Sequence, residues 1–222
     1  MLYIVATPIG NYADITLRAL DVLKNCDIVI GEEYRIASTF LKKVGLPEKE
    51  ILLLNEHAKE KDIRELVDVC ASKNVALISD CGTPGFADPG AALIKLCRVK
   101  NIAVTALPGP SSLMTILSLS SQKSSQFLYI GFLPANKQER IMAIKALKTE
   151  NKSWVLMDTP YRLKNILTDL ASEMPNERGL LGVNLTQESE LIIEGTFKEL
   201  LAKCRLEEGE FIILRYAHTK DK

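Results

Sequence analysis

The chain has 222 residues, of which 47% are hydrophobic and 25% are charged. This is the composition of an ordinary globular protein, and it disfavours a disordered, collagen-like or coiled-coil chain. Twenty-eight basic residues balance 28 acidic ones, so no basic excess indicates non-specific nucleic-acid binding. No apolar run approaches the ~20 residues that a membrane helix needs, and the first residues do not resemble a signal peptide. We therefore expect a cytoplasmic protein with no membrane segment.

The cysteines and histidines give no sign of a metal site. Five cysteines are widely spread and form no Cys-x-x-Cys pair, and the two histidines, His57 and His218, lie far apart. These spacings favour neither a disulfide framework nor a zinc site nor a histidine-based catalytic triad. Cys81 lies in a Gly/Pro-rich turn, but no histidine or basic residue nearby in the sequence would activate it as a nucleophile. We expect no metal.

Short apolar runs alternate with helical periodicity in the first half of the chain. Asp14 is expected to cap the first helix, whose apolar spacing runs through Ile15, Ala19 and Leu23. Strands are expected at 3–6, 27–31, 51–54, 75–79 and 102–107, with later helices at 35–44, 62–71, 91–99 and from Ser111. Five such strand and helix units predict an α/β domain with a parallel five-stranded sheet, spanning residues 1–117.

The segment 118–126, SLSSQKSSQ, is polar and serine-rich, and we interpret it as a linker. The remainder, 127–222, is predicted to be a second, mixed α/β domain. Residues 191–195 follow the preceding strand too closely for a helical crossover and are expected to return as a hairpin. Strands are expected at 127–131, 154–157, 180–185 and 211–215, separated by helices near 138–147, 161–172 and 196–204.

Three loops at predicted strand ends carry the functional signal. They are TPIGN after the first strand, the segment 79–90 after the fourth, and PGPSS after the fifth. Loops at the carboxyl ends of parallel strands share one edge of the sheet, where ligands bind. Glycine allows close backbone approach and proline fixes the loop, so this edge predicts a preformed pocket. Neither a GxGxxG nor a GxxxxGK[ST] motif is present, which disfavours a dinucleotide-binding fold and a P-loop enzyme.

Four segments together resemble a known family: LYIVATPIGNYADITLRAL, ISDCGTPGFADPG, ALPGPSS and GFLPA. They resemble the ribosomal small-subunit RNA 2′-O-ribose (cytidine) methyltransferase I family of the tetrapyrrole (corrin and porphyrin) methylase superfamily. The resemblance implies a two-domain fold with S-adenosyl-L-methionine in the cleft between the domains, within a homodimer. It further implies a methyltransferase that acts on a cytidine ribose of small-subunit (16S) ribosomal RNA, with ribosomal RNA or the small subunit as partner.

The same resemblance implies a set of residues that bind the cofactor. Backbone groups and small hydroxyls suit its amino-acid and ribose parts, and an aspartate suits hydroxyl or ammonium donors. The implied residues are Pro8, Ser79, Asp80, Gly82, Thr83, Asp88, Ser111, Ser112, Met157, Asp158, Asn184, Leu185, Thr186, Glu210 and Phe211.

Catalytic and substrate-binding candidates follow from position in the predicted sheet. Glu32 directly follows the second strand, so we interpret it as a proton acceptor for a ribose hydroxyl, with Arg35 binding a phosphate or orienting Glu32. Acidic residues at this place also serve as ordinary helix N-terminal residues, and that alternative stays open. Tyr161 and Arg162, at the end of a strand in the second half, are candidates for holding a nucleotide.

Two alternatives to ribosomal RNA methylation stay open. One is a tetrapyrrole or other small-molecule methylase of the same superfamily. The other is a module that binds S-adenosyl-L-methionine without catalysis. Both are kept because residues 183–187, VNLTQ, lack the arginine, acid and lysine of the family's usual segment.

Overall fold

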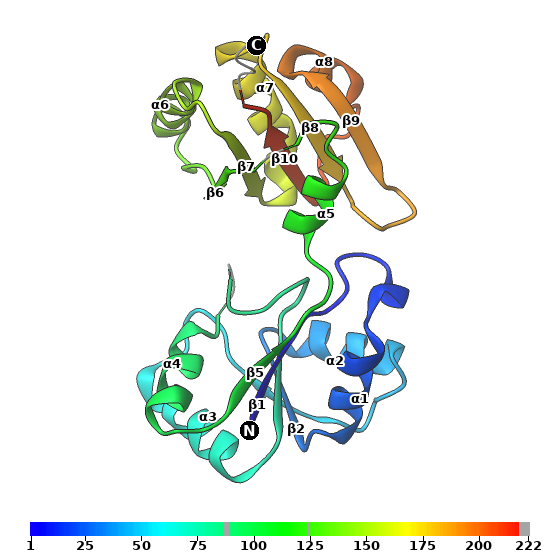
Figure 1. Cartoon of the computed structure of the whole chain (residues 1–222), viewed down its shortest axis with the longest axis vertical. Helices are drawn as coiled ribbons and strands as arrows, with labels where there is room; N and C mark the ends of the chain where they lie inside the picture. The colour runs from blue at the N-terminus through cyan, green and yellow to red at the C-terminus, as the bar shows by residue number, and fades with distance from the viewer. Residues whose placement is uncertain (87–88, 124, 218–222) are drawn as a thin grey trace. The chain divides into compact units, whose positions relative to one another are not determined.

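The structure is a computed structural model that describes residues 1–86, 89–123 and 125–217. The chain forms two compact units, which divide after Ser111 (Figure 1). We call residues 1–111 unit 1 and the chain from Ser112 onward unit 2, and we describe each by itself.

Unit 1 contains a parallel five-stranded sheet, as the alternating pattern predicts, and the structure gives its strand order as β3-β2-β4-β1-β5. Strands β2 and β4 are buried along their whole length, which is typical of a parallel sheet covered on both faces. The strands are β1 (Leu2–Val5), β2 (Ile28–Gly31), β3 (Glu50–Leu53), β4 (Val75–Ile78) and β5 (Val104–Leu107).

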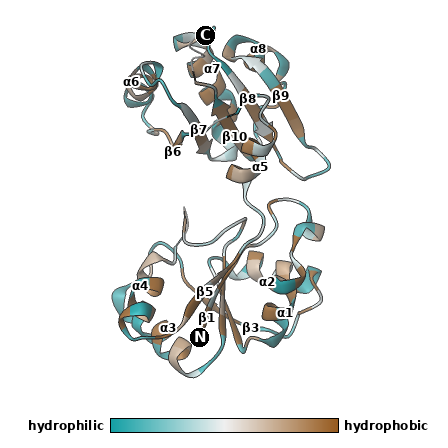
Figure 2. Ribbon diagram, in the orientation of Figure 1, coloured by the Kyte–Doolittle hydropathy of each residue, from teal (hydrophilic) through white to brown (hydrophobic). Residues whose placement is uncertain are grey.

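Four helices of unit 1 cover the two faces of this sheet. Apolar side chains of α1 (Leu17–Asn25) and α2 (Tyr34–Lys43) pack on one face. Those of α3 (Glu60–Ser72) and α4 (Ala91–Val99) pack on the other. Figure 2 shows the apolar strands between these helices. The chain leaves the neighbouring strands β1 and β4 toward opposite faces, and such a switch point opens a crevice at their carboxyl ends.

The start of the first helix differs from the sequence prediction. Asp14 does not cap it but ends a short 3-10 turn, η1 (Tyr12–Asp14). The cap is Thr16, whose hydroxyl accepts a hydrogen bond from the backbone N–H of Ala19 at 3.1 Å. Both residue types are good helix caps, and the 3-10 turn decides between them.

Unit 2 has a mixed five-stranded sheet with the order β6-β7-β10-β8-β9. Strands β6 and β7 run parallel, whereas β10 pairs antiparallel with β7 and β8. The predicted hairpin is confirmed, because β9 pairs antiparallel with β8. The strands are β6 (Phe127–Gly131), β7 (Ser153–Asp158), β8 (Arg178–Val183), β9 (Leu191–Thr196) and β10 (Phe211–Arg215).

Helices α6 (Lys137–Lys148), α7 (Leu163–Glu173) and α8 (Phe197–Lys203) build the main core of unit 2 with this sheet. A 3-10 turn, η2 (Pro160–Arg162), precedes α7. The helix that the sequence places at the end of the first domain is α5 (Ser112–Ser118), and it packs on β8 and β10 of unit 2. Its buried Ile116 fills the space above Gly182, where a Cβ would lie 3.1 Å from the Ile116 side chain.

Candidate active site

Three loops meet at the carboxyl edge of the unit 1 sheet. The loop after β1 joins the loop after β4 through the Thr7 N–H, which donates to the Gly82 carbonyl at 2.8 Å. The Thr83 hydroxyl then donates to the carbonyl of Pro110, in the loop after β5, at 3.2 Å. The sequence predicts that these loops share one edge, and the sheet topology places them there.

Ser79 and Gly82 hold the turn after β4. The buried Ser79 hydroxyl donates to the Gly82 carbonyl at 3.1 Å, and the Thr7 hydroxyl donates to the Ser79 carbonyl at 3.1 Å. Gly82 has a φ of 82°, a conformation that glycine adopts without the strain other residues incur. The turn is therefore fixed by its own hydrogen bonds before any ligand binds.

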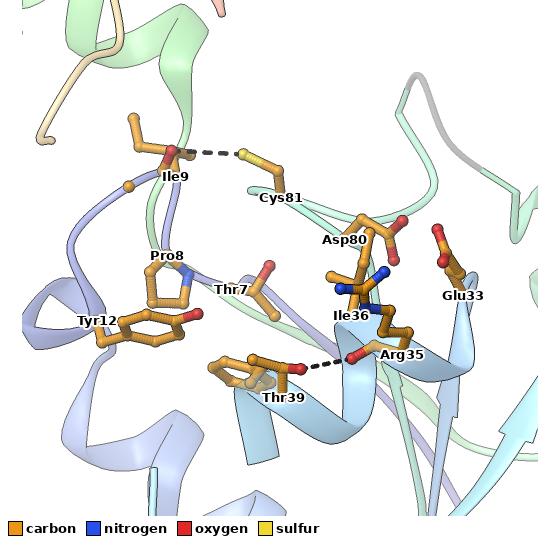
Figure 3. Close-up of a pocket in the computed structure, with 12 residues that line it drawn as sticks. Thr7, Pro8, Ile9, Tyr12, Glu33, Arg35, Ile36, Thr39, Asp80 and Cys81 are labelled. Atoms are coloured by element: carbon orange, nitrogen blue, oxygen red, sulfur yellow. Dashed lines mark hydrogen bonds between the residues drawn. The ribbon is translucent and has the colours of Figure 1, made fainter. Parts of the chain in front are cut away.

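A cavity of about 610 Å³ opens at this edge, beside β1, β2 and β4 (Figure 3). Its size is that of a pocket for a small molecule or a nucleotide. One part of the wall is apolar and the other carries two carboxylates, a guanidinium, hydroxyls and a thiol. The wall consists of Thr7, Pro8, Ile9, Gly10, Tyr12, Glu33, Arg35, Ile36, Thr39, Phe40, Asp80 and Cys81. We call this cavity the edge pocket.

The two carboxylates of the edge pocket lie at the ends of neighbouring strands. Asp80 follows β4, and Glu33 follows β2. Burial raises the pKa of Asp80, and the negative charge of Glu33 raises it further, whereas a hydrogen bond from the Glu33 backbone opposes the rise. Figure 3 shows both carboxylates on the same side of the pocket. Asp80 is thus a poorly solvated carboxylate that lies beside a second negative charge, that of Glu33.

Arg35 and Tyr12 supply the cation and the aromatic ring. Arg35 lies in the first turn of α2, and among the described residues no carboxylate forms an ion pair with it. The ring of Tyr12 stacks on Phe40, with centroids 6.5 Å apart and planes inclined by 16°. Phe40 is 6% exposed whereas Tyr12 is 42% exposed, so the buried ring supports the accessible one.

Of the two adjacent glutamates, Glu33 rather than Glu32 forms the pocket wall. The chain is extended at Glu33, with φ −118° and ψ 126°, and side chains alternate along an extended segment. The sequence interpretation favours Glu32 because it directly follows the second strand, and position along the chain does not define the side on which a side chain lies. It also missed Tyr12, Thr39 and Phe40, because nothing in the local pattern separates them from ordinary packing residues.

The cofactor residues predicted for unit 1 fall into three groups. Pro8 and Asp80 line the edge pocket, whereas Ser79, Gly82 and Thr83 build the turns beside it. Ser111 ends unit 1 and is half-buried. Asp88 lies outside the described residues.

In unit 2, Asp158 and Arg162 form an ion pair at the end of β7. Arg162 Nη1 lies 2.9 Å from Asp158 Oδ1, which also accepts from the Thr159 backbone N–H at 2.8 Å. Arg162 donates further to the carbonyls of Leu133 and Pro134. Its guanidinium is thus committed to contacts within unit 2, while Tyr161 beside it is 68% exposed.

The second carboxylate oxygen of Asp158 can still accept a hydrogen bond. Asp158 Oδ2 is buried and has no hydrogen-bond partner among the described residues. A buried acceptor without a donor costs free energy, so a ligand hydroxyl or ammonium group would be stabilised there. Next to it, the Met157 sulfur is approached by the hydroxyls of Ser112 at 3.8 Å and of Tyr129 at 3.6 Å.

The other predicted residues of unit 2 lie where the loop after β8 meets the start of β10. Asn184 accepts from the Glu210 N–H through its side chain at 3.0 Å, and its own N–H donates to the Glu210 carbonyl at 2.7 Å. Asn184 and Thr186 both have positive φ, 50° and 66°. Leu185 and Phe211 are buried beside them. The structure therefore brings this group together within unit 2.

The described residues contain neither a metal-site cluster nor a membrane-spanning helix. No group of three or more His, Cys, Asp or Glu residues in that part of the chain has the arrangement of a metal site. Among the same residues, no helix has the length and apolar character needed to cross a membrane.

Comparison with known proteins matches residues 1–201 to the family described as Tetrapyrrole (Corrin/Porphyrin) Methylases. Proteins named ribosomal RNA small subunit methyltransferase I are similar over most of their length. The protein from Escherichia coli O157:H7 is 36% identical, over 98% of this chain and 78% of its own. The protein from Leptospira borgpetersenii serovar Hardjo-bovis (strain L550) is 37% identical, over 90% of this chain and 81% of its own.

Two solved structures share the fold. A diphthine synthase has a TM-score of 0.71 and 16% identity, covering 98% of this chain and 90% of its own. The cobalamin biosynthetic enzyme cobalt precorrin-4 methyltransferase has a TM-score of 0.69 and 16% identity, covering 97% and 94%. At these identities the likeness concerns the fold alone.

Proposed function

We propose that this chain, which belongs to the ribosomal RNA small subunit methyltransferase I family of tetrapyrrole methylases and is a methyltransferase, methylates the 2′-hydroxyl of a cytidine ribose in small-subunit (16S) ribosomal RNA. The methyl donor is S-adenosyl-L-methionine. The partner is ribosomal RNA, presented by the small subunit.

The observation that carries this proposal is the content of the edge pocket. A nucleotide offers a flat base, a phosphate and a ribose hydroxyl, and the pocket wall holds an aromatic ring, a guanidinium and carboxylates. Aromatic stacking, cation contacts to phosphate and proton acceptance by a carboxylate are the matching interactions. The pocket lies at the sheet's switch point, where open α/β sheets bind ligands.

The donor chemistry of both units fits S-adenosyl-L-methionine. When bound, this cofactor supplies a methyl group activated by a sulfonium centre. In unit 1, the exposed Thr83 retains acceptor lone pairs beyond its hydrogen bond to Pro110. In unit 2, the orphaned Asp158 Oδ2 would accept from a hydroxyl or ammonium group. We propose both as cofactor contacts, with Ser79 and Gly82 fixing the turn that carries Thr83.

Arg162 then has a positioning role in the proposal. Its ion pair to Asp158 and its bonds to two carbonyls orient the carboxylate, so that Oδ2 keeps one direction. Tyr161, which is exposed beside it, is the candidate for an RNA contact. The Asn184, Leu185, Thr186, Glu210 and Phe211 group stays a prediction for cofactor binding.

The test is methylation of small ribosomal subunits purified from a strain that lacks this gene. We expect label from methyl-tritiated S-adenosyl-L-methionine in 16S RNA, and mass spectrometry of nuclease digests to identify a 2′-O-methylcytidine. Large subunits serve as the control substrate. Label absent from 16S RNA would overturn the proposal. Methylation of uroporphyrinogen III instead would favour the tetrapyrrole alternative, and calorimetric donor binding without turnover on either substrate would favour the non-catalytic module.

The family resemblance also leads us to propose a cytoplasmic homodimer. Sedimentation equilibrium of the purified full chain measures the mass of the particle, and a monomer at micromolar concentration would contradict the dimer. Fractionation of cells with an antibody to this chain tests the location.

A further inference from the structure

We infer that Asp80 receives the proton of the acceptor hydroxyl, in a nucleotide pocket where Tyr12 stacks on the base and Arg35 binds a phosphate. This inference rests on the proposed methyl transfer to a ribose hydroxyl. It differs from the sequence analysis in two respects. There, the family resemblance makes Asp80 a cofactor-binding residue, and Glu32 is the candidate proton acceptor.

The position of Asp80 is the first support. It follows the central strand β4, lines the edge pocket and accepts a hydrogen bond from the Glu33 backbone. The ends of β4 and β2 are neighbours in the sheet, so the Asp80 carboxylate and the Glu33 backbone lie close together at the pocket wall. A proton acceptor that the protein already holds near the substrate loses little entropy on reaching the reactive geometry, and this lowers the activation free energy.

The electrostatics of Asp80 separate it from the other carboxylate of the pocket. Glu33 is exposed, whereas Asp80 is half-buried, and burial together with the Glu33 charge raises its pKa. A carboxylate with a raised pKa is the stronger base, and general bases work best when their pKa approaches the working pH. The charged groups of the pocket wall beside Asp80 are Glu33 from the β2 end and Arg35 from α2, whereas the Cys81 thiol points away, to the Ile9 carbonyl.

Tyr12 and Arg35 define how the nucleotide lies. The Tyr12 ring packs on buried Phe40, lines the pocket and is 42% exposed, so part of its surface is accessible. Arg35 contributes the guanidinium of the wall, and its planar fork of donors suits a phosphate. Figure 3 shows Tyr12 under Pro8, with Arg35 and Asp80 across the pocket from it. A single nucleotide turned out of its stack would span these groups.

The proposed step balances. The acceptor oxygen forms a bond to the methyl carbon as the bond from methyl to sulfur breaks, and the sulfur keeps the electron pair as a neutral thioether. The hydroxyl proton passes to the Asp80 carboxylate, which becomes a neutral carboxyl group and later releases the proton to water.

The main experiment measures single-turnover methylation of gene-deletion small subunits by the full chain. We expect Asp80→Asn to lower the rate constant by roughly 100-fold or more, the range of a lost general base. Calorimetric affinity for S-adenosylhomocysteine should stay within twofold of wild type, and Asp80→Glu should recover part of the rate. Melting curves establish that each variant is folded.

The pH profile gives a second, independent readout. The wild-type rate should rise with pH as Asp80 deprotonates, and this limb should vanish in Asp80→Asn. Glu33→Gln keeps the backbone donor but removes the like charge, so the limb should move to lower pH. An unchanged Asp80→Asn rate, or a limb that disappears in Glu32→Gln and persists in Asp80→Asn, would overturn the inference.

The base contact is tested with a matched pair of tyrosines. Tyr12→Ala should raise KM for small subunits roughly tenfold, the value of one lost stacking contact. Tyr34, 59% exposed at the start of α2, does not line the pocket, and Tyr34→Ala should leave KM unchanged. Equal effects of both substitutions on KM would refute the proposal that the base stacks on Tyr12. If wild-type protein itself leaves 16S RNA unlabelled, the proposed function fails, not the assignment of Asp80 alone.

Discussion

At the scale of single residues, the group proposed as the base also destabilises the folded state. The pKa of Asp80 is raised in the folded chain, so the ionised form is less favourable there than in the unfolded chain. Folding stability is therefore lost as the pH rises through the folded pKa, and no cost remains below the unfolded value of about 3.9. We expect Asp80→Asn to raise Tm at pH 7.5 and to leave it unchanged near pH 3.5.

Differential scanning calorimetry across this pH range measures the effect. Glu65→Gln, an exposed site on α3, serves as the control for removing one negative charge. If Asp80→Asn lowers Tm at pH 7.5, the environment of Asp80 favours the charged form, contrary to our account. A variant with higher stability and a lower methylation rate would mark a site where function and stability conflict.

Gly109 is a second residue whose role is set by its neighbours. A Cβ at this position would lie 2.8 Å from the Cβ of Ala6, because the loop after β5 passes close to the end of β1. Both atoms are attached to backbone, so relief requires the loops to separate. We expect Gly109→Ala to lower the free energy of unfolding by about 1–3 kcal/mol, the usual cost of overpacking.

Urea denaturation of Gly109→Ala, Ala6→Gly and the double variant forms a mutant cycle. The double variant restores one Cβ in the shared space and should be more stable than the sum of the single effects indicates. Additive losses would mean that the close approach at this edge carries no strain.

At the scale of elements, a buried ion pair joins α6 to α7. Arg140 Nε lies 2.7 Å from Asp169 Oδ2, both side chains are under 10% exposed, and Arg140 also donates to the Ala135 carbonyl. Removing one partner leaves a buried charge, which costs about 3–5 kcal/mol. We expect Asp169→Ala to lose that much stability in urea denaturation, while Arg140→Met/Asp169→Leu regains most of it. A loss below about 1 kcal/mol for Asp169→Ala would show that water reaches the pair.

The local sequence pattern predicts where the helices and strands lie, but it does not predict which of them pack against one another. Apolar periodicity predicts the elements of both sheets, because burial imposes that periodicity directly, and the short connection before residues 191–195 predicts the hairpin of β8 and β9. The unit on which α5 packs depends on Ile116 meeting the surface over Gly182, a contact between distant segments. Arg162 likewise bonds to carbonyls of the β6–α6 loop as well as to Asp158, and no spacing in the sequence reveals these loop contacts.

The same distinction applies to the site. Gly/Pro-rich loops predict the edge of the sheet where the pocket lies, since their composition reflects backbone geometry. Whether Glu32 or Glu33 lines the pocket depends on a shift of one residue along an extended segment. Sequence patterns do not locate the end of a strand to within one residue, so they do not predict which glutamate it is. The stack of Tyr12 on Phe40 joins η1 to α2, and it becomes visible only when both are folded.

At the scale of the whole molecule, a net charge of zero constrains how the chain binds RNA. Without a general positive field, affinity for RNA must come from local cations, and the number of phosphate contacts sets the salt dependence of binding. Arg35 is the cation of the edge pocket. We expect Arg35→Met to weaken binding to gene-deletion small subunits roughly tenfold, a typical value for one lost charge-assisted contact.

The salt dependence separates this contact from a loss of general attraction. In filter binding at several KCl concentrations, one phosphate contact contributes about 0.7–0.9 to the slope of log K against log salt. Arg35→Met should reduce the slope by that amount. Arg98→Met removes an exposed arginine in the last turn of α4, on the other face of the sheet from α2, and should leave the slope unchanged. Equal slopes for the wild type and Arg35→Met would show that Arg35 binds no phosphate, because counterion release follows each contact that is lost.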